Sequence, residues 1–315
     1  MPLESCSPTA SPTHSINRNV SAKILLTGAN GQLGRELKRS LAPLGELFAL
    51  TRLQLDLARP DELVRVVRQI APTLIVNAAA WTAVDKAESE APLAHAINGV
   101  APGILAEEAK RMNAMLVHYS SDYVYDGTGI AAWKETDEAH PQSAYGRSKL
   151  AGDNAIATVG GRYLILRTSW VYATRGGNFA KTMLRLATER DSLTVIDDQF
   201  GAPTSAELLA DVTAHALRSL QTKPELAGLY HCVAAGETTW HGYARYVLEQ
   251  ALALGVPLKA GPAQVQATAT SSYPTPACRP LNSRLDTGKL HRAFGLQLPH
   301  WQQGVQRMLT EISGK

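Results

Sequence analysis

A tyrosine and a lysine stand four residues apart in the segment YGRSK, at positions Tyr145 and Lys149. Four residues are about one helical turn, so these two side chains share a face, and Arg147 and Ser148 are expected on the outer face. A phenol with a pKa near 10 releases its proton poorly at neutral pH unless a positive charge lies nearby. The spacing suits proton transfer, but a surface helix with one solvated lysine explains the same five residues.

A glycine-rich turn, GANGQLG (28–34), precedes this segment by about 110 residues. Glycines let a backbone approach a pyrophosphate closely, and the helix that follows offers free N–H groups and a positive dipole end. The spacing G-x-x-G-x-x-G departs from the common G-x-G-x-x-G pattern, and a tight turn with close helix packing is the alternative. We expect the turn to bind a dinucleotide through Gly28, Gly31, Gln32, Leu33 and Gly34.

The choice of dinucleotide depends on the end of the second predicted strand. Thr51 and Arg52 occupy the position where an acidic residue would bind the ribose 2′-hydroxyl of NADH. Arg52 can pair instead with a 2′-phosphate, which favours NADPH and leaves NADH open. Asp56 could accept a hydrogen bond from the adenine ring. Further expected cofactor contacts are Leu57, Ala80, Trp81 and Thr82.

Strand and helix patterns alternate around these motifs. Continuous apolar strands separated by helices indicate a parallel sheet that is covered on both faces. The expected strands lie in the apolar run that begins at Lys23 and at 46–51, 73–80, 114–121 and 162–170. The expected helices follow the glycine turn, with Leu33, Leu37 and Leu41 on one stripe, and lie at 60–70, near 91–112 and around YGRSK. These patterns predict a Rossmann-type doubly wound α/β domain over residues 22–172.

The remaining residues, 173–315, have a looser pattern. Helices are expected at 178–190 and 206–220, strands at 192–198 and 228–234, and an ordered functional loop region at 262–286. We expect a smaller C-terminal α/β substrate-binding lobe, with some segments returning to the main sheet.

Composition excludes several other classes of protein. The chain of 315 residues carries a formal charge of +3, which is too balanced for nucleic acid or an anionic membrane as the main partner. Residues 1–21 are rich in Ser, Thr and Pro and are expected to be a disordered extension rather than a secretory signal. Three scattered cysteines indicate neither a disulfide framework nor a zinc site, so a cytoplasmic protein is expected.

Longer segments around both motifs resemble the extended short-chain dehydrogenase/reductases and, within them, the dTDP-4-dehydrorhamnose reductase family. The resemblance runs from about residue 22 to residue 312. It rests on VNAAAWTAVDKAESE (76–90), HYSSDYVYDG (118–127), YGRSKLAGD (145–153), RTSWVYATRGGNFAKTMLRLA (167–187), DDQFGAPTSAELLAD (197–211) and YPTPACRPLNSRLD (273–286). It implies NAD(P)H-dependent reduction of dTDP-4-dehydro-β-L-rhamnose at C4 to dTDP-β-L-rhamnose, the last step of dTDP-L-rhamnose synthesis.

The resemblance also implies roles for single residues. Tyr145 would donate a proton to the C4 oxygen, and Lys149 would bind the nicotinamide ribose and lower the tyrosine pKa. Ser121 stands where the family usually has threonine, and it would polarise the carbonyl. Substrate contacts are expected from Asp122, Trp170, Gln199, Arg279 and Asn282.

Some members of the family are dimers with Mg²⁺ held by glutamates, and the matching positions are Glu36, Glu207 and Glu311. A homodimer that takes a nucleotide-sugar substrate is therefore expected. Two alternatives remain. The first is an epimerase or dehydratase of the same superfamily, which recycles its nicotinamide, and the second is a non-catalytic NADP-binding regulatory subunit.

Overall fold

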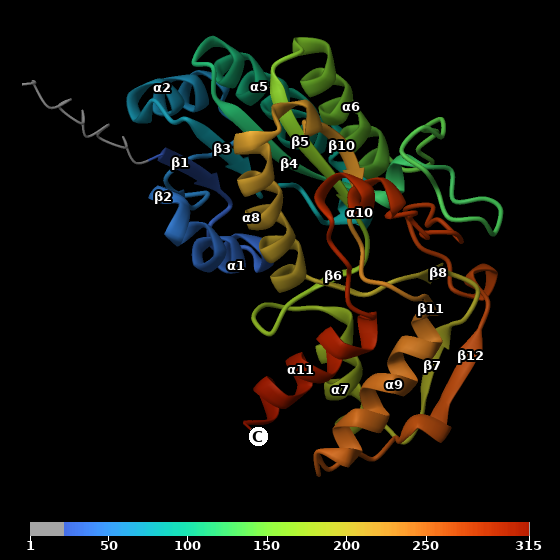
Figure 1. Cartoon of the computed structure of the whole chain (residues 1–315). Coiled ribbons are helices and arrows are strands. Elements are labelled where there is room, and N and C mark those ends of the chain that lie inside the picture. Colours follow the sequence, from blue (N-terminus) through green and yellow to red (C-terminus); the bar gives the residue numbers. More distant parts are fainter. Residues whose placement is uncertain (1–21, 315) are drawn as a thin grey trace, which may run out of the picture.

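A six-stranded parallel sheet forms the centre of the molecule (Figure 1). The computed structural model describes residues 22–314, so the predicted extension at 1–21 lies outside the described residues. The strands run in the order β10-β5-β4-β3-β1-β2, and every neighbouring pair is parallel. Their bounds are β1 (Ala22–Thr27), β2 (Gly45–Leu50), β3 (Leu74–Asn77), β4 (Met115–Ser121), β5 (Arg162–Thr168) and β10 (Gly228–His231).

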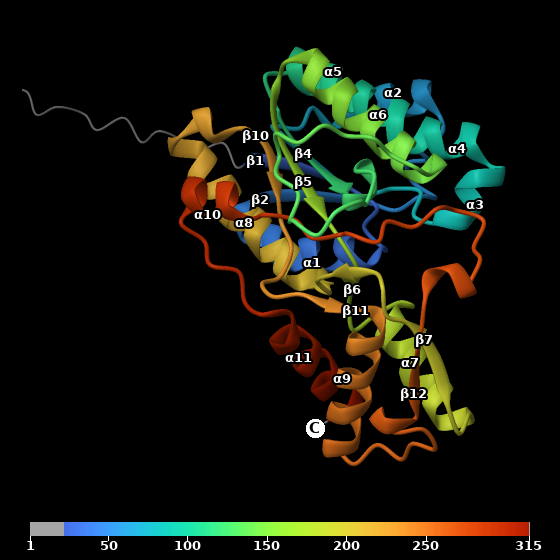
Figure 2. The same cartoon turned by 90° about the vertical axis from the view of Figure 1, so that its right-hand side faces the viewer.

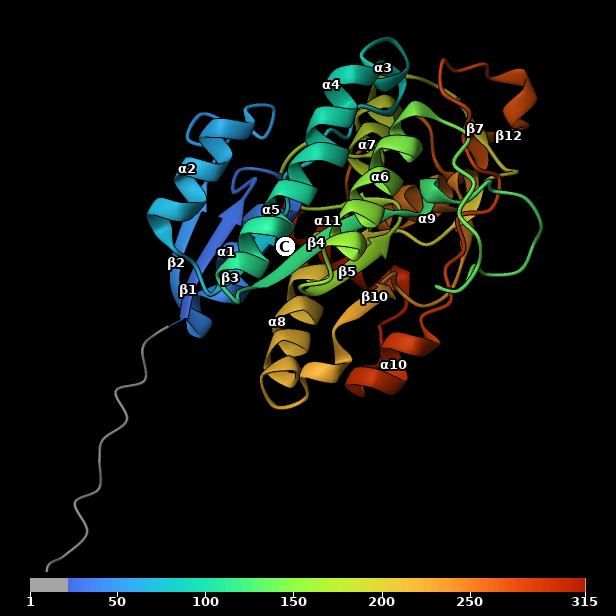
Figure 3. The ribbon, with the colours of Figure 1, turned by 90° about the horizontal axis from the view of Figure 1, so that it is seen from above.

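Helices cover both faces of this sheet, as Figure 3 shows from above. One face packs on α1 (Gln32–Leu41), α8 (Ala206–Thr222) and α10 (Gly288–Phe294), and the other on α2 (Pro60–Ile70), α5 (Ala101–Arg111) and α6 (Ala144–Val159). Successive residues of β1 serve opposite faces: Ile24 and Leu26 belong to the first core, and Leu25 belongs to the second. The predicted Rossmann-type doubly wound sheet is therefore confirmed.

A smaller group of elements lies below the carboxyl ends of the strands (Figure 2). It contains α7 (Phe179–Glu189), α9 (Trp240–Ala253), α11 (Trp301–Ser313) and a parallel pair of β7 (Leu193–Ile196) with β12 (Val265–Thr268). Two-residue pairs connect it to the main domain, β6 (Val171–Tyr172) with β9 (Thr204–Ser205) and β8 (Phe200–Gly201) with β11 (Thr238–Thr239). Because β10, α8 and α10 pack in the main domain, residues beyond 172 contribute to it, and the boundary at 172 remains a proposal.

One predicted loop is partly a strand. The segment 262–286 was expected to be aperiodic, but Val265–Thr268 forms β12 and pairs in register with Leu193–Ile196. Four residues are too few to show a period, so only the partner strand identifies the element. The sequence interpretation also omitted α9, α10 and α11, which are three helices of the C-terminal half.

The order of the strands in the main sheet reverses between β1 and β3, since β2 lies on one side of β1 and the later strands of this sheet lie on the other. In open α/β sheets a ligand binds outside the carboxyl ends of the strands at such a point. None of the helices within residues 22–314 has both the length and the apolar character needed to cross a bilayer.

Candidate functional site

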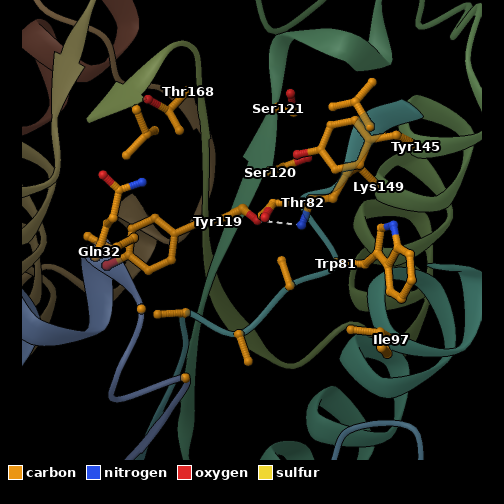
Figure 4. A pocket seen from close by; sticks show the side chains of 18 of the residues that line it. Gln32, Trp81, Thr82, Ile97, Tyr119, Ser120, Ser121, Tyr145, Lys149 and Thr168 are labelled. Carbon is orange, nitrogen blue, oxygen red and sulfur yellow. Dashed lines mark hydrogen bonds between the residues drawn. The ribbon is translucent and has the colours of Figure 1, made fainter. Parts of the chain in front are cut away.

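A cavity of about 670 Å³ opens at this reversal point, between the sheet and the smaller group of elements (Figure 4). Its wall contains almost all of the residues expected to bind the cofactor. These are Gly28, Gly31, Gln32, Leu33, Arg52, Asp56, Leu57, Ala80, Trp81, Thr82, Tyr145 and Lys149. The structure therefore brings the glycine turn and the YGRSK motif to one site.

The glycine turn is shaped for close backbone contact. Gly28 has φ +70°, and a Cβ atom on it would lie 2.7 Å from the backbone nitrogen of Ala79. Gly34 lies behind the cavity wall, where a Cβ atom would clash with the carbonyl of Gly28. Glycine is thus required at position 28 by the left-handed backbone and at position 34 by the close packing of the helix on the turn.

Several buried polar atoms near this cradle have no hydrogen-bond partner among the described residues. They are Oε1 of Gln32, Oγ1 of Thr168 and Oγ of Ser169, and all three residues line the cavity. Buried polar groups in proteins are normally paired, so these atoms suit a polar ligand such as a dinucleotide. The glycine turn and these unpaired acceptor and hydroxyl groups therefore fit NAD(P)H.

Arg52 lies at the far end of the cavity from the sheet centre. Its side chain is 71% exposed, and its Nε lies 3.8 Å from Oδ2 of Asp56. Asp56 in turn accepts a hydrogen bond from the backbone N–H of Ala58 at 3.0 Å. The guanidinium is held loosely and is free to pair with a phosphate.

Helix α6 presents the tyrosine and the lysine. Ser143 caps its first turn by accepting a hydrogen bond from the N–H of Gly146 at 3.0 Å, so the helix begins just before Tyr145. Lys149 is 2% exposed, and its Nζ donates to the carbonyl oxygen of Tyr119 at 2.7 Å. Both side chains point from α6 toward the end of β4, where Ser121 lies (Figure 4).

The acid–base properties of this pair are set mainly by burial. Burial raises the pKa of Tyr145, and the hydrogen-bonding hydroxyl of Ser121 opposes that rise only in part. Burial lowers the pKa of Lys149 to about 8, although the carboxylate of Asp153 acts in the opposite direction. In the protein alone burial is the largest effect on the pKa of Tyr145, and the lowering of that pKa by Lys149 stays a prediction.

Ser121 and Asp122 are adjacent at the end of β4 and line the same cavity. The Ser121 hydroxyl donates to Oδ1 of Asp122 at 2.9 Å. Burial raises the pKa of Asp122 to about 6, while hydrogen bonds from Ser283 and Ser121 lower it. In this arrangement the serine proton points to the Asp122 carboxylate, and the serine oxygen accepts a hydrogen bond from the backbone N–H of Tyr123 at 3.2 Å.

Trp170 is placed in the cavity wall by an unusual backbone. Its φ is +49°, which is costly for an aromatic residue, and it lies two residues after the end of β5. The indole stacks on that of Trp240 with ring centroids 3.7 Å apart. Trp240 comes from α9, so the two indoles close the cavity from the main domain and from the smaller group of elements.

Three residues expected to contact the substrate have protein partners instead. Gln199 is buried, donating to Thr270 Oγ1 at 3.1 Å and accepting from Trp240 Nε1 at 3.0 Å. Asn282 is buried and donates to the carbonyl of Ala131 at 2.8 Å. Arg279 pairs with Asp85 at 2.8 Å, which ties the C-terminal segment to α3 (Val84–Ser89).

The three glutamates expected to bind magnesium do not form a metal site within the chain. Glu207 pairs with Arg307, and Glu311 accepts a hydrogen bond from Thr174 at 2.9 Å. Burial and the neighbouring Glu36 raise the pKa of Glu207. Across residues 22–314, no group of three His, Cys, Asp or Glu side chains is arranged to hold a metal ion, so a single copy of the chain shows no magnesium site.

Within YGRSK, Arg147 is exposed as expected, but the outer-face assignment of Ser148 is wrong. Ser148 is 3% exposed, and its oxygen accepts a hydrogen bond from Nδ2 of Asn98 at 3.0 Å. Asn98 also binds both backbone polar groups of Trp81, at 2.9 and 3.0 Å. It lies in a π-helical segment (Ala96–Val100) that follows α4 (Ala91–His95), and helix periodicity gives no sign of this connection.

The sequence interpretation missed further residues of the cavity wall. Thr168 and Ser169 could have been found, because Thr168 ends β5 beside Ser121 and Ser169 follows it. Tyr119 and Trp240 also line the cavity. No local pattern marks Trp240, since it reaches the site only through the packing of α9.

The chain matches a family of known sequences and several solved structures. Residues 22–313 match the family described as "RmlD substrate binding domain". A dTDP-4-dehydrorhamnose reductase of Salmonella typhimurium is 54% identical over 293 residues, covering 92% of this chain and 97% of that protein. The structure of such a reductase from Clostridium acetobutylicum is similar with a TM-score of 0.84 and 35% identity, and covers 92% of this chain and 99% of the other. A Bacillus anthracis dTDP-4-dehydrorhamnose reductase in complex with NADP gives a TM-score of 0.83 and 32% identity, with the same coverage.

Proposed function

The chain belongs to the RmlD substrate-binding-domain family, whose relatives include dTDP-4-dehydrorhamnose reductases, and from this we infer that it is such a reductase. It reduces the C4 carbonyl of dTDP-4-dehydro-β-L-rhamnose and gives dTDP-β-L-rhamnose, the last step of dTDP-L-rhamnose biosynthesis. One observation carries the chemistry. Tyr145 and Lys149 line the same cavity as the glycine turn, so an acid and a dinucleotide site face one another.

When bound, NAD(P)H supplies the hydride that C4 receives. We assign its diphosphate to the turn at Gly28 and Gly31, where a backbone without Cβ atoms borders the cavity. Arg52 is the group that would pair with a 2′-phosphate, which supports NADPH as the preferred cofactor and leaves NADH as a second one.

The reduction also needs one proton at the C4 oxygen. We assign its donation to the phenol of Tyr145, which becomes a phenolate as the carbonyl becomes a hydroxyl. The ammonium of Lys149 would stabilise that phenolate through its positive charge. Ser121, whose hydroxyl interacts with the same phenol, would hold the carbonyl oxygen beside it.

Substrate contacts follow from the cavity wall. We propose that Trp170 packs on the sugar and that Asp122 binds its hydroxyls, since both line the cavity. Gln199 and Asn282 are proposed to act through the segments that they hold. Arg279 would have to exchange Asp85 for a phosphate before it could bind the nucleotide.

A cofactor assay tests the function directly. Purified protein mixed with NADPH and dTDP-4-dehydrorhamnose should consume one reduced cofactor for each sugar reduced, followed by the absorbance of the nicotinamide and by product chromatography. An epimerase or dehydratase would convert the sugar without net loss of NADPH. A regulatory subunit would bind NADPH and leave the sugar unchanged, and either result would overturn the proposal.

We also propose a homodimer in the cytoplasm. Cys232 and Cys278 are free thiols, as expected in a reducing compartment. The family resemblance supports the dimer, and light scattering of the purified protein tests it. Magnesium stays a prediction, and no step of the reaction is assigned to it.

A further inference from the structure

A row of buried polar side chains crosses the sheet and ends at the catalytic lysine. Thr27, Asn77 and His118 are direct neighbours on β1, β3 and β4, each 1% exposed. The Thr27 hydroxyl donates to Asn77 Oδ1 at 2.6 Å, and Asn77 Nδ2 lies 3.1 Å from His118 Nδ1. The other ring nitrogen, Nε2, lies 3.3 Å from Lys149 Nζ.

The donors and acceptors along this row decide which ring nitrogen of His118 carries the proton. Thr27 Oγ1 accepts from the N–H of Ala79 at 3.3 Å and directs its own proton to the Asn77 carbonyl oxygen. The Asn77 NH₂ group then faces His118, and because it only donates, Nδ1 must accept. A neutral imidazole that accepts at Nδ1 carries its proton on Nε2, and burial lowers the pKa of His118 well below its usual value, which keeps it neutral.

The Nε2–H group therefore points at Lys149. A lysine ammonium has donors only, whereas the neutral amine has a lone pair that can accept this proton. Two other neighbours act against His118 and favour the charged form of Lys149. They are the Tyr119 carbonyl on β4 and the Asp153 carboxylate on α6. Arg167 on β5 pairs with Asp153 at 3.0 Å and limits that effect, while Tyr145 lies one turn away on α6.

We propose, given the reductase function above, that His118 is a positioning residue that presents Nε2–H to Lys149 and so makes its ammonium easier to deprotonate. Thr27 and Asn77 act through His118 by fixing its tautomer. The row therefore sets the pH above which Lys149 loses the charge that supports Tyr145 during proton donation.

The pH profile of kcat/KM tests this tuning. In His118→Gln an amide oxygen can face Lys149 and accept from the ammonium. The fall of kcat/KM on the alkaline side of the profile, here called the high-pH limb, should therefore move to a pH about one unit higher. His231→Gln is the matched control, because His231 is also buried but bonds to Tyr125 at 2.8 Å. A limb that stays in place in His118→Gln, or that moves equally in both variants, rejects the proposal.

Nitrogen-15 NMR of labelled histidine gives a second test that does not depend on turnover. The His118 signals are those lost in His118→Gln, or in His118→Asn if the glutamine variant does not fold. We expect a neutral Nε2–H tautomer throughout pH 6 to 9. A Nδ1–H tautomer or a protonated ring would overturn the inference even in an active reductase, whereas an inactive protein with the expected tautomer would refute only the reductase function.

Discussion

Trp170 and Trp240 stack almost face to face, with ring centroids 3.7 Å apart and planes 16° from parallel. The first follows a strand of the main sheet, and the second begins helix α9 in the smaller group of elements. Trp240 Nε1 also donates to Gln199, so its ring is fixed by a hydrogen bond as well as by stacking. Trp240 therefore supports the strained backbone position of Trp170 beside the proposed sugar site.

Replacing this support should weaken sugar binding. We expect Trp240→Ala to raise KM for the dTDP-sugar about fivefold, since a stacked aromatic pair is worth about 1 kcal/mol. The Kd for NADPH should change little, because the substitution leaves the glycine turn and Arg52 intact. Trp133→Ala is the control, as Trp133 stacks on Tyr125 and does not line the cavity. Equal changes of KM in both variants would assign the effect to general destabilisation.

Removing the proposed acid tests the chemistry itself. Tyr145→Phe keeps the ring that packs edge-on against Tyr123 at 5.5 Å but has no proton to donate. We expect kcat to fall by about 10² to 10⁴ while NADPH affinity stays within about twofold. The measurement is stopped-flow absorbance of the nicotinamide, with Tyr163→Phe on β5 as the control. Turnover at the parent rate would remove Tyr145 from the mechanism.

The sequence predicted those parts of the site that depend on local spacing. Tyr145 and Lys149 are one helical turn apart, and the turn at Gly28 directly precedes its helix, so short-range geometry places them. Trp240, His118 and Asn98 function through contacts between distant elements, and one-dimensional periodicity contains no information on such pairs. Gln199 and Asn282 were expected at the substrate from the family resemblance, and in the structure their amides hold loops together.

The elements of the fold also differ in whether local sequence or a distant partner identifies them. The main sheet was predicted because each of its strands is a continuous apolar run flanked by helices. The strand β12 was not predicted. Its four residues have one buried, two exposed and one intermediate position, which is no regular alternation, and only the pairing with β7 identifies the strand.

The left-handed glycine of the cofactor turn allows a test with a matched pair. Gly28 and Gly129 both have φ +70°, but a Cβ atom would meet backbone atoms within 3 Å at Gly28 and nothing within 4 Å at Gly129. Gly129→Ala should cost about 1 kcal/mol of unfolding free energy from backbone strain alone. Gly28→Ala should cost about 2 kcal/mol more and weaken NADPH at least tenfold, because the turn must shift. Urea denaturation and fluorescence titration measure both, and equal NADPH affinities would place the diphosphate elsewhere.

Cofactor preference depends on Arg52 if this residue pairs with the 2′-phosphate. Arg52→Ala should lower kcat/KM for NADPH about tenfold and leave that for NADH unchanged, since only NADPH carries the extra phosphate. The loss should shrink at high salt, where exposed charges are screened. Arg59→Ala is the control, because Arg59 is 72% exposed, pairs with Glu62 and lies outside the cavity wall. A parallel loss with both cofactors would contradict the assignment.

Burial of Lys149 also affects stability in a pH-dependent way. Its pKa falls from 10.5 to about 8 on folding, so between those values the unfolded chain binds more protons than the folded one. Stability therefore rises with pH through this window, and below about pH 8 the buried charge costs on the order of 3 kcal/mol.

Lys149→Met removes that charge and keeps the length of the side chain. It also leaves the Tyr119 carbonyl without its donor, which costs on the order of 1 kcal/mol, so a net gain of about 2 kcal/mol is expected at pH 7. The gain should disappear by about pH 10, because the folded lysine is then neutral and the remaining cost of its burial no longer exceeds the loss of the hydrogen bond. Lys110→Met is the control, because exposed Lys110 also donates to a backbone carbonyl, that of Val159 at 2.6 Å, and should show no such pH dependence. Thermal melting across pH 6 to 10.5 measures the difference, and a variant less stable than the parent at pH 7 would show that the ammonium stabilises the fold.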